Sequence, residues 1–151
     1  FNPAVKLFKS DMDKVANADQ KFPYVCTTYS CTEHWCSGFT RWQPWLLEMQ
    51  PEAYIEIGDK LADELGIKNG AHVKVSSARG EMECVAMVTK RLTPFTVEGK
   101  VVHQVGMPFN YSWRFPEDAP DATTNYLSIA VGCPNTYCPE YKAFMVNVSK
   151  A

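Results

Sequence analysis

The residues best suited to metal or redox chemistry are the six cysteines, and their spacing limits what that chemistry can be. They stand at positions 26, 31, 36, 84, 133 and 138. Structural zinc sites favour closely spaced cysteine pairs that occur twice, and iron–sulfur clusters use a still tighter series. His34 lies between Cys31 and Cys36, but side chains along an extended strand alternate between faces and diverge. We therefore expect buried thiols or one disulfide here, and no metal site.

Three segments rich in hydrogen-bonding and aromatic side chains are the candidates for binding a ligand. They span residues 32–44, 106–125 and 132–142 and are dense in Trp, His, Asn, Thr, Tyr and Lys. Long segments without regular structure are uncommon in a compact domain unless they have a function. Such side chains can stack on a flat heterocycle and bind its edges. The alternative is that the aromatic residues only fix the loops to the body of the domain.

Composition predicts one folded domain and excludes several classes of partner. The chain has 151 residues, of which 46% are hydrophobic and 13% aromatic, and a net charge of -2. These values are typical of a globular core and provide no basic stripe for nucleic acid. The apolar runs are much shorter than the ~20 residues that cross a bilayer, so we expect no membrane insertion. The first residue is Phe1, which is typical of a processed product or a piece of a longer chain.

The elements that must position these loops are mainly strands. We expect a lead-in segment over 1–21 and a single domain over 22–151. Alternation of apolar and polar residues predicts strands over 22–29, 72–75, 82–88, 100–105 and 143–148, with a short extended piece over 53–57. A helix over 59–65 should end at Gly66. Short strands, one or two short helices and long ligand-binding loops predict a mainly β, closed barrel.

Three motifs then resemble one family in its order along the chain. The first runs from Phe22 to Trp35 (FPYVCTTYSCTEHW) and continues with GFTR at 38–41 and PWLLE at 44–48. The second is VHQVGMP at 102–108, and the third is GCPNTYCPEYKAFMVNV at 132–148. Together they resemble the C-terminal molybdopterin-dinucleotide-binding domain of formate dehydrogenase catalytic (alpha) subunits, which are Mo/W bis-pterin oxidoreductases of the DMSO reductase type.

The resemblance implies a double-psi β-barrel that binds and orients a bis-(molybdopterin guanine dinucleotide) cofactor with Mo or W. The whole enzyme would oxidise formate to CO2. Its catalytic residues, metal ligand and iron–sulfur cysteines would belong to other domains, so this chain alone should have no catalytic residue. The implied partners are the remainder of the catalytic subunit and an iron–sulfur electron-transfer subunit. The location is periplasmic or cytoplasmic, and the cysteine content favours the periplasm.

The same resemblance identifies the residues expected to contact the cofactor. Donors should bind pterin and phosphate edges, cations should balance the charge of the pyrophosphate, and aromatic rings should wall the pterin. These residues are Thr32, His34, Trp35, Thr40, Arg41, Gln104, Gly106, Asn125, Tyr141 and Lys142. We expect their loops to converge on one edge of the barrel. Asn110 and Cys133 depart from the family pattern, and we assign them no direct contact.

Other classes of function stay open at this point. The alternatives are a separate cofactor-binding subunit and the same domain of another Mo/W bis-pterin oxidoreductase such as a nitrate reductase. A barrel enzyme of unrelated chemistry, such as a decarboxylase, would need a catalytic motif that the sequence does not display. The motifs at both ends of the chain favour formate dehydrogenase.

Overall fold

The structure is a computed structural model of the chain. It describes residues 20–36, 38–97, 99–111, 123–128, 132–133, 135–139 and 141–151. Most of the expected lead-in segment lies outside these residues. No helix in the described ranges is long and apolar enough to cross a membrane.

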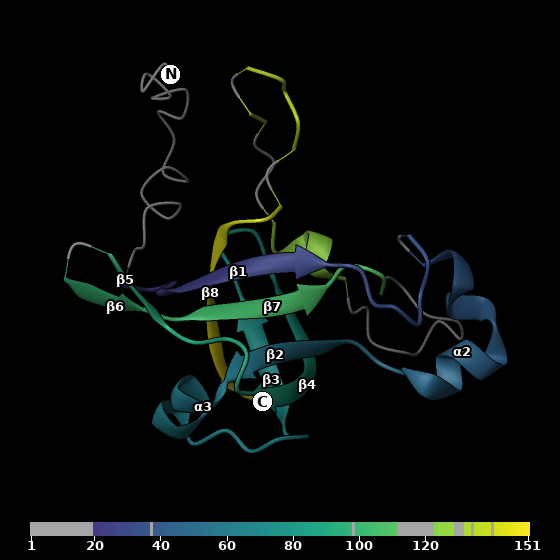
Figure 1. The fold of residues 1–151 in the computed structure, drawn as a ribbon, viewed down its shortest axis with the longest axis horizontal. Helices are drawn as coiled ribbons and strands as arrows, with labels where there is room; N and C mark the ends of the chain where they lie inside the picture. The colour runs from purple at the N-terminus through teal and green to yellow at the C-terminus, as the bar shows by residue number, and fades with distance from the viewer. Residues whose placement is uncertain are drawn as a thin grey trace.

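Six of the described strands close into a barrel, as the sequence predicts for a mainly β domain (Figure 1). Their order around the barrel is β1-β7-β2-β4-β3-β8. The bounds are Tyr24–Tyr29 for β1, Tyr54–Gly58 for β2, His72–Ser76 for β3, Glu81–Thr89 for β4, Gln104–Pro108 for β7 and Phe144–Lys150 for β8. The short β5 (Phe95–Val97) and β6 (Lys100–Val102) form a separate hairpin.

Two of the pairings in the barrel are parallel, and this determines where the loops emerge. β1 pairs with β7 from Val25↔Gln104 to Tyr29↔Pro108, and β2 pairs in parallel with β4. The arrows of β1 and β7 therefore point the same way, toward the part of the molecule that holds α2 (Figure 1). β8 runs antiparallel to β1, with Phe144 opposite Cys26. The start of β8 thus lies beside the middle of β1, and its next residues pair with the beginning of β1.

The core fills the barrel with side chains from alternating strand positions. Val73 and Val75 are fully buried on β3, and Val146 has no exposed surface on β8. Their neighbours are more exposed, because successive side chains on a strand face opposite sides. β2 is the exception, since all five of its residues are buried. A strand covered on both faces loses the alternation by which it would be found in the sequence.

Two expected elements differ from the structure. The piece over 53–57 was expected as a short extended segment outside the barrel, but β2 is one of the six barrel strands. The strand expected over 100–105 is divided at His103: its first half is β6, and its second half begins β7. β7 also continues to Pro108, into the segment expected as a loop. Because of the break at His103, one stretch of chain contributes β6 to the hairpin and β7 to the barrel.

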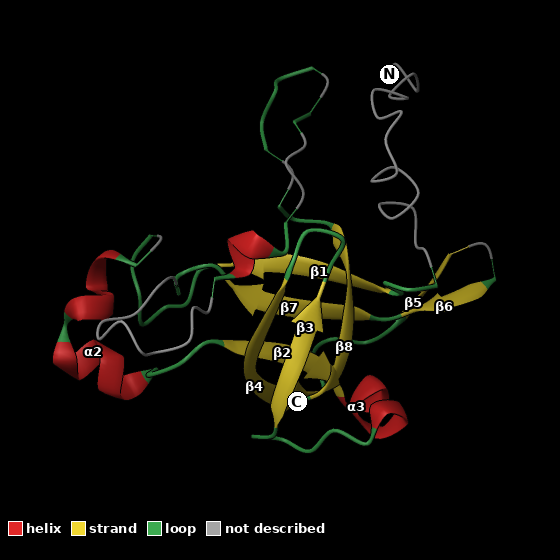
Figure 2. Cartoon of the chain, turned by 180° about the vertical axis from the view of Figure 1, so that it is seen from behind, coloured by secondary structure: helices red, strands yellow, loops and turns green. Residues whose placement is uncertain are grey.

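The helices lie at the ends of the barrel (Figure 2). α3 spans Asp59–Leu65 as predicted, packs against β2 and β4, and ends at Gly66, which has a left-handed φ of 63°. The 3-10 turn η1 (Phe39–Trp42) forms inside the segment expected as the first loop, and α2 (Pro44–Met49) begins at the last residue of that segment. A second 3-10 turn, η2 (Thr124–Tyr126), follows β7. The mainly β barrel with two short helices is confirmed.

Candidate cofactor-binding site

A pocket of about 470 Å³ opens where β1 and β7 end. Its described lining consists of Thr28, Phe109, Asn125, Tyr141 and Lys142. Small-molecule sites in proteins are concave and typically have volumes of about 300–1,000 Å³, with a few polar groups among apolar walls. This pocket combines two aromatic rings with one amide and one ammonium group. Its composition suits a ligand that is both flat and anionic.

The topology brings three distant segments together at this pocket. Parallel pairing places Tyr29 beside Pro108, so the chain leaves β1 and β7 on the same side. Phe109 N donates a hydrogen bond to the Tyr29 carbonyl oxygen over 3.0 Å, which extends the pairing by one residue. Thr124 Oγ1 donates to the Pro108 carbonyl oxygen over 2.7 Å and ties η2 to the end of β7. Asn125 therefore faces the same opening as the residues before β8.

Lys142 is held at the pocket by contacts from both strands. Its Nζ donates a hydrogen bond to the Thr28 carbonyl oxygen and lies 5.6 Å from the centre of the Phe109 ring. Thr28 Oγ1 donates in turn to the Tyr141 carbonyl oxygen over 2.7 Å. An ammonium group has three N–H donors, and the Thr28 carbonyl takes one of them. The other two remain for an anionic group entering the pocket.

A second group of predicted residues is fixed to the barrel by Asn110. This side chain has no exposed surface. Its Oδ1 accepts a hydrogen bond from Cys31 N over 2.6 Å, and its Nδ2 donates to the carbonyl oxygens of His34, over 3.2 Å, and Cys36. One amide, two residues after β7, thus binds three points of the loop that follows β1. Asn110 positions this loop, and the sequence analysis missed that role.

His34 anchors the far end of the same loop. It is 1% exposed, and its Nε2 donates to the Gln50 carbonyl oxygen over 3.0 Å. Tyr111 Oη donates to the same oxygen over 3.0 Å, and its ring meets the His34 ring edge-on at 5.6 Å. Because a carbonyl only accepts, Nε2 must carry a proton. His34 Nδ1 is buried with no hydrogen-bond partner among the described residues.

The remaining predicted residues of this loop lie in and around η1. Thr40 Oγ1 accepts a hydrogen bond from Trp35 N over 2.7 Å. The Arg41 side chain is buried, and its guanidinium carbon lies 4.8 Å from the centre of the Trp42 ring. Thr32 is exposed at the start of the loop. These residues and His34 therefore lie together in the loop that follows β1. The loop is next to the strands that end at the pocket, but its residues are not among the described pocket lining.

Two predicted residues do not join either group. Gln104 begins β7, opposite Val25, and its Nε2 donates to the Thr93 carbonyl oxygen over 3.0 Å. It lies at the other end of the strand from the pocket. Gly106 is buried in mid-strand, where a Cβ would come within 2.9 Å of Tyr29 Cε1. These two residues therefore lie apart from the described pocket lining: Gly106 packs against Tyr29, and Gln104 binds the segment before β5, so their contact with the cofactor stays a prediction.

Thr28 and Phe109 are pocket residues that the sequence analysis did not select. A threonine within a strand has no feature that separates a binding role from ordinary β-propensity. Phe109 does carry a signal, because it follows Pro108 at the start of an aromatic and amide cluster. Their positions become informative only once the parallel register of β1 and β7 is known.

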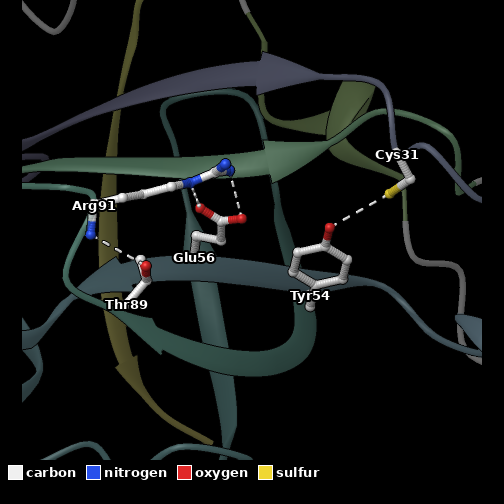
Figure 3. Close-up of polar contacts among 5 residues, drawn as sticks. All are labelled: Cys31, Tyr54, Glu56, Thr89 and Arg91. Carbon is white, nitrogen blue, oxygen red and sulfur yellow. Dashed lines mark hydrogen bonds and ion pairs between the residues drawn. The ribbon is translucent and has the colours of Figure 1, made fainter.

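Two further polar contacts involve the β2 residues Tyr54 and Glu56 (Figure 3). Glu56 is buried and accepts two hydrogen bonds from Arg91, over 2.8 Å from Nε and 2.6 Å from Nη2. Cys31 Sγ and Tyr54 Oη are 3.5 Å apart. Burial raises the pKa of Tyr54 and of Cys31 above their ordinary values. Both groups stay protonated at neutral pH, which makes this contact a structural one with no reactive thiolate.

The described part of the chain provides no group of three His, Cys, Asp or Glu side chains that could hold a metal ion. All six cysteines lie in that part, and no disulfide joins them. The donor set is instead suited to an organic, anionic ligand. The ammonium group of Lys142, the amide of Asn125 and the rings of Phe109 and Tyr141 fit the phosphates and heterocycles of a pterin dinucleotide.

Comparisons with known proteins agree with this chemistry. The family model described as "Molydopterin dinucleotide binding domain" matches residues 24–145. The alpha subunit of formate dehydrogenase 2 (cytochrome c-553) from Nitratidesulfovibrio vulgaris is 54% identical over 99% of this chain and 15% of its own length. The formate dehydrogenase alpha subunit of Megalodesulfovibrio gigas is 46% identical over 99% of this chain and 15% of its own length. The chain thus spans about one-seventh of the length of these relatives.

More distant similarities extend the same picture. A nitrate reductase from Symbiobacterium thermophilum is 29% identical over 98% of this chain and 18% of its own length. Acetylene hydratase from Pelobacter acetylenicus shares the fold with a TM-score of 0.68 at 12% identity, covering 87% of this chain and 19% of that one. The matched family model covers both parallel strands, the pocket residues and the start of β8. The chain belongs to the molydopterin dinucleotide-binding domain family.

Proposed function

We propose that this chain is the cofactor-binding domain of a formate dehydrogenase catalytic subunit and that it holds a bis-(molybdopterin guanine dinucleotide) cofactor carrying Mo or W. The observation that supports this most directly is the pocket at the ends of β1 and β7, where Lys142 is fixed by the Thr28 carbonyl and the Phe109 ring. The names of the most similar relatives support formate as the substrate of the whole enzyme.

The residues of this chain orient the cofactor and neutralise its charge. Lys142 donates to phosphate or pterin oxygens, and Asn125 binds an edge of the heterocycle. Phe109 and Tyr141 face its planar parts. The loop anchored by Asn110 supplies Arg41 and His34 as further contacts. The cofactor and its metal supply the redox chemistry of formate oxidation to CO2, and the catalytic residues belong to other domains.

We propose the remainder of the catalytic subunit as the main partner, and an exposed aromatic surface supports this. Large apolar side chains that are 51–70% exposed gather on η1, α2 and the loop before them: Trp35, Phe39, Trp42, Trp45 and Met49. α2 itself has no buried residue. A surface of this kind marks an interface in a soluble protein. An iron–sulfur electron-transfer subunit is proposed as a second partner of the whole enzyme, and the periplasm as its location.

The second candidate is the same domain in another Mo/W bis-pterin oxidoreductase. The nitrate reductase of Symbiobacterium thermophilum supports it, at 29% identity. The formate dehydrogenases at 46% and 54% identity favour the first candidate. Formate-dependent reduction of a dye by the full-length protein, set against nitrate reduction by the same preparation, separates the two.

The pocket assignment is tested in the full-length protein by Asn125→Ala. Asn125 lines the pocket and is exposed there. Asn135→Ala is the matched control, because Asn135 is also an exposed asparagine after β7 but does not line the pocket. We expect pterin and metal per chain to fall in the first variant and to stay at the wild-type level in the second. Undiminished content in Asn125→Ala would remove Asn125 from the site, and the absence of pterin from the wild-type protein would refute the proposed function.

A further inference from the structure

Cys133 and Cys138 face each other across a small hairpin that leads into the pocket. Gly132 and Pro139 form an antiparallel bridge, and Cys133 N donates a hydrogen bond to the Cys138 carbonyl oxygen over 2.8 Å. Tyr137 N donates to the Cys133 carbonyl oxygen over 2.7 Å and closes the turn. The two cysteines are therefore the pair directly inside the bridge.

This backbone pairing places the two side chains on the same side of the hairpin. Directly opposed residues of antiparallel strands point to one face, with Cα atoms about 4.5–5.5 Å apart. Disulfides span Cα separations of about 4.4–6.8 Å. Tyr137 holds a left-handed φ of 58°, which tightens the turn between the two cysteines. The hairpin is already folded around the position that a disulfide would occupy.

The two thiols also differ from the other cysteines in their access to an oxidant. Cys138 is exposed and Cys133 is partly exposed, whereas Cys26, Cys31 and Cys84 are buried. Cys36 is exposed but lies in the loop that Asn110 fixes. Thiol oxidation follows exposure and the presence of a nearby second thiol. Cys133 and Cys138 are the pair that meets both conditions.

We propose that Cys133 and Cys138 form a reversible disulfide that locks this hairpin, with a low-molecular-weight disulfide such as oxidised glutathione as the oxidant. The thiolate of one cysteine attacks a sulfur of oxidised glutathione and releases one glutathione. The second cysteine then attacks the protein sulfur of the mixed disulfide and releases the other glutathione. The two protein thiols lose two electrons and two protons, which appear in two reduced glutathione molecules.

The position of the hairpin gives the disulfide a consequence for the pocket. Pro139 closes the bridge, and Tyr141 and Lys142, which line the pocket, follow it by two and three residues. Without the disulfide, no covalent bond joins the two sides of the hairpin. With the disulfide, the segment that delivers Lys142 to the Thr28 carbonyl starts from a covalently closed loop. The formation of the bond itself does not depend on the proposed function.

Tyr137 provides a direct test, because it lies between the two cysteines and is 87% exposed. The full-length protein is treated with oxidised glutathione, its remaining thiols are alkylated in denaturant, and it is digested with chymotrypsin without reduction. Cleavage after Tyr137 separates Cys133 from Cys138. We expect mass spectrometry to find the two fragments joined, and dithiothreitol to release both.

The single variants Cys133→Ser and Cys138→Ser are the matched controls. In each, the remaining cysteine should carry one glutathione, because no second thiol is present to displace it. Separate Cys133 and Cys138 fragments in the oxidised wild-type protein, whether alkylated or bound to glutathione, would overturn the proposal. So would either fragment joined to a third cysteine.

Discussion

Arg91 binds the buried carboxylate of Glu56 with both prongs of its guanidinium group, Nε to Oε2 over 2.8 Å and Nη2 to Oε1 over 2.6 Å. The Glu56 side chain is 8% exposed, whereas that of Arg91 is 64% exposed. The ion pair thus covers the outer face of β2. The carboxylate of Glu56 is buried, and the guanidinium group of Arg91 lies at the surface. Hydrogen bonding to Glu56 raises the pKa of Arg91 further, so the guanidinium group stays charged.

Removing Arg91 should destabilise the barrel because it leaves the carboxylate of Glu56 buried without its partner. We expect Arg91→Ala to lower the free energy of unfolding by roughly 1–3 kcal/mol, the cost of losing a hydrogen bond to a buried charged group. The control is Lys74→Ala, which breaks an exposed pair with Glu81 at 2.7 Å and should cost less than about 1 kcal/mol. Urea unfolding of the wild type and the two variants measures both losses of unfolding free energy. Equal losses in the two variants would contradict the expectation.

Asn110→Ala should release the loop that follows β1. The variant leaves Cys31 N and the carbonyl oxygens of His34 and Cys36 without the amide that binds them, which should cost roughly 1–3 kcal/mol. Asn110→Asp keeps the acceptor but loses both donors and should be intermediate. Chymotryptic cleavage at Trp35 and Phe39 reports loop release directly. Unchanged cleavage rates in Asn110→Ala would show that other contacts fix the loop.

Lys142→Ala should weaken cofactor retention and leave the barrel intact. The ammonium group is exposed and contributes little to the core, but a charge-assisted hydrogen bond to an anionic ligand is worth roughly 1–3 kcal/mol. Pterin and metal per chain in the full-length variant measure the loss. Lys74→Ala is again the control, since Lys74 lies on β3 and does not line the pocket. Full cofactor content in Lys142→Ala would mean that Lys142 does not bind the ligand.

Arg41→Lys should be harmful although it keeps the charge. The guanidinium group is buried and stacks on the Trp42 ring at 4.8 Å, which an ammonium group cannot reproduce. We expect reduced cofactor content in the full-length variant and no change in far-UV circular dichroism. Wild-type content would show that only the charge at this position matters.

Alkaline pH should destabilise the domain through its buried thiols. Burial raises the pKa of the Cys84 thiol from its ordinary 9.0 to about 12. Between these values the unfolded chain releases this proton while the folded chain keeps it. Rising pH therefore stabilises the unfolded state relative to the folded state. The contribution of this thiol to the free energy of unfolding is therefore fully present below pH 9. Above pH 9 it falls by about 1.4 kcal/mol per pH unit.

The Cys84→Ala variant checks the size of that effect. It should show a shallower loss of unfolding free energy between pH 9 and 11 than the wild type. The cavity left by the missing thiol costs the same at every pH, so the slopes are compared and the absolute values are not. Identical slopes would mean that other groups, such as the buried Cys26, carry the whole dependence.

Local patterns in the sequence predict those elements whose signal is local. Val73 and Val75 alternate with polar neighbours and predict β3, and Gly66 correctly ends the helix Asp59–Leu65. The role of β2 is not visible in this way because both of its faces are buried. The division at His103 is also hidden, since the valines on both sides of it are typical of one continuous strand.

The candidate site, too, can be predicted only where the signal is local. Residue type and family resemblance identify Asn125, Tyr141 and Lys142, which the structure brings to one pocket. The anchoring role of Asn110 depends on its hydrogen bond with Cys31, 79 residues away in the chain. Gly106 is explained by a close approach to Tyr29, which also requires the register of β1 on β7. Contacts of this kind cannot be read from spacing.

The pairing of β1 with β8 has a consequence for how the chain folds during synthesis. Tyr24, on the first barrel strand, lies opposite Val146 on the last. Non-local pairing slows folding because the ends of a long segment must meet before any contact stabilises them. On the ribosome, β1 leaves the exit tunnel with one of its edges lacking its final neighbour until β8 has been made. We therefore expect the nascent barrel to stay open, with its apolar interior accessible to chaperones, until β8 has left the tunnel.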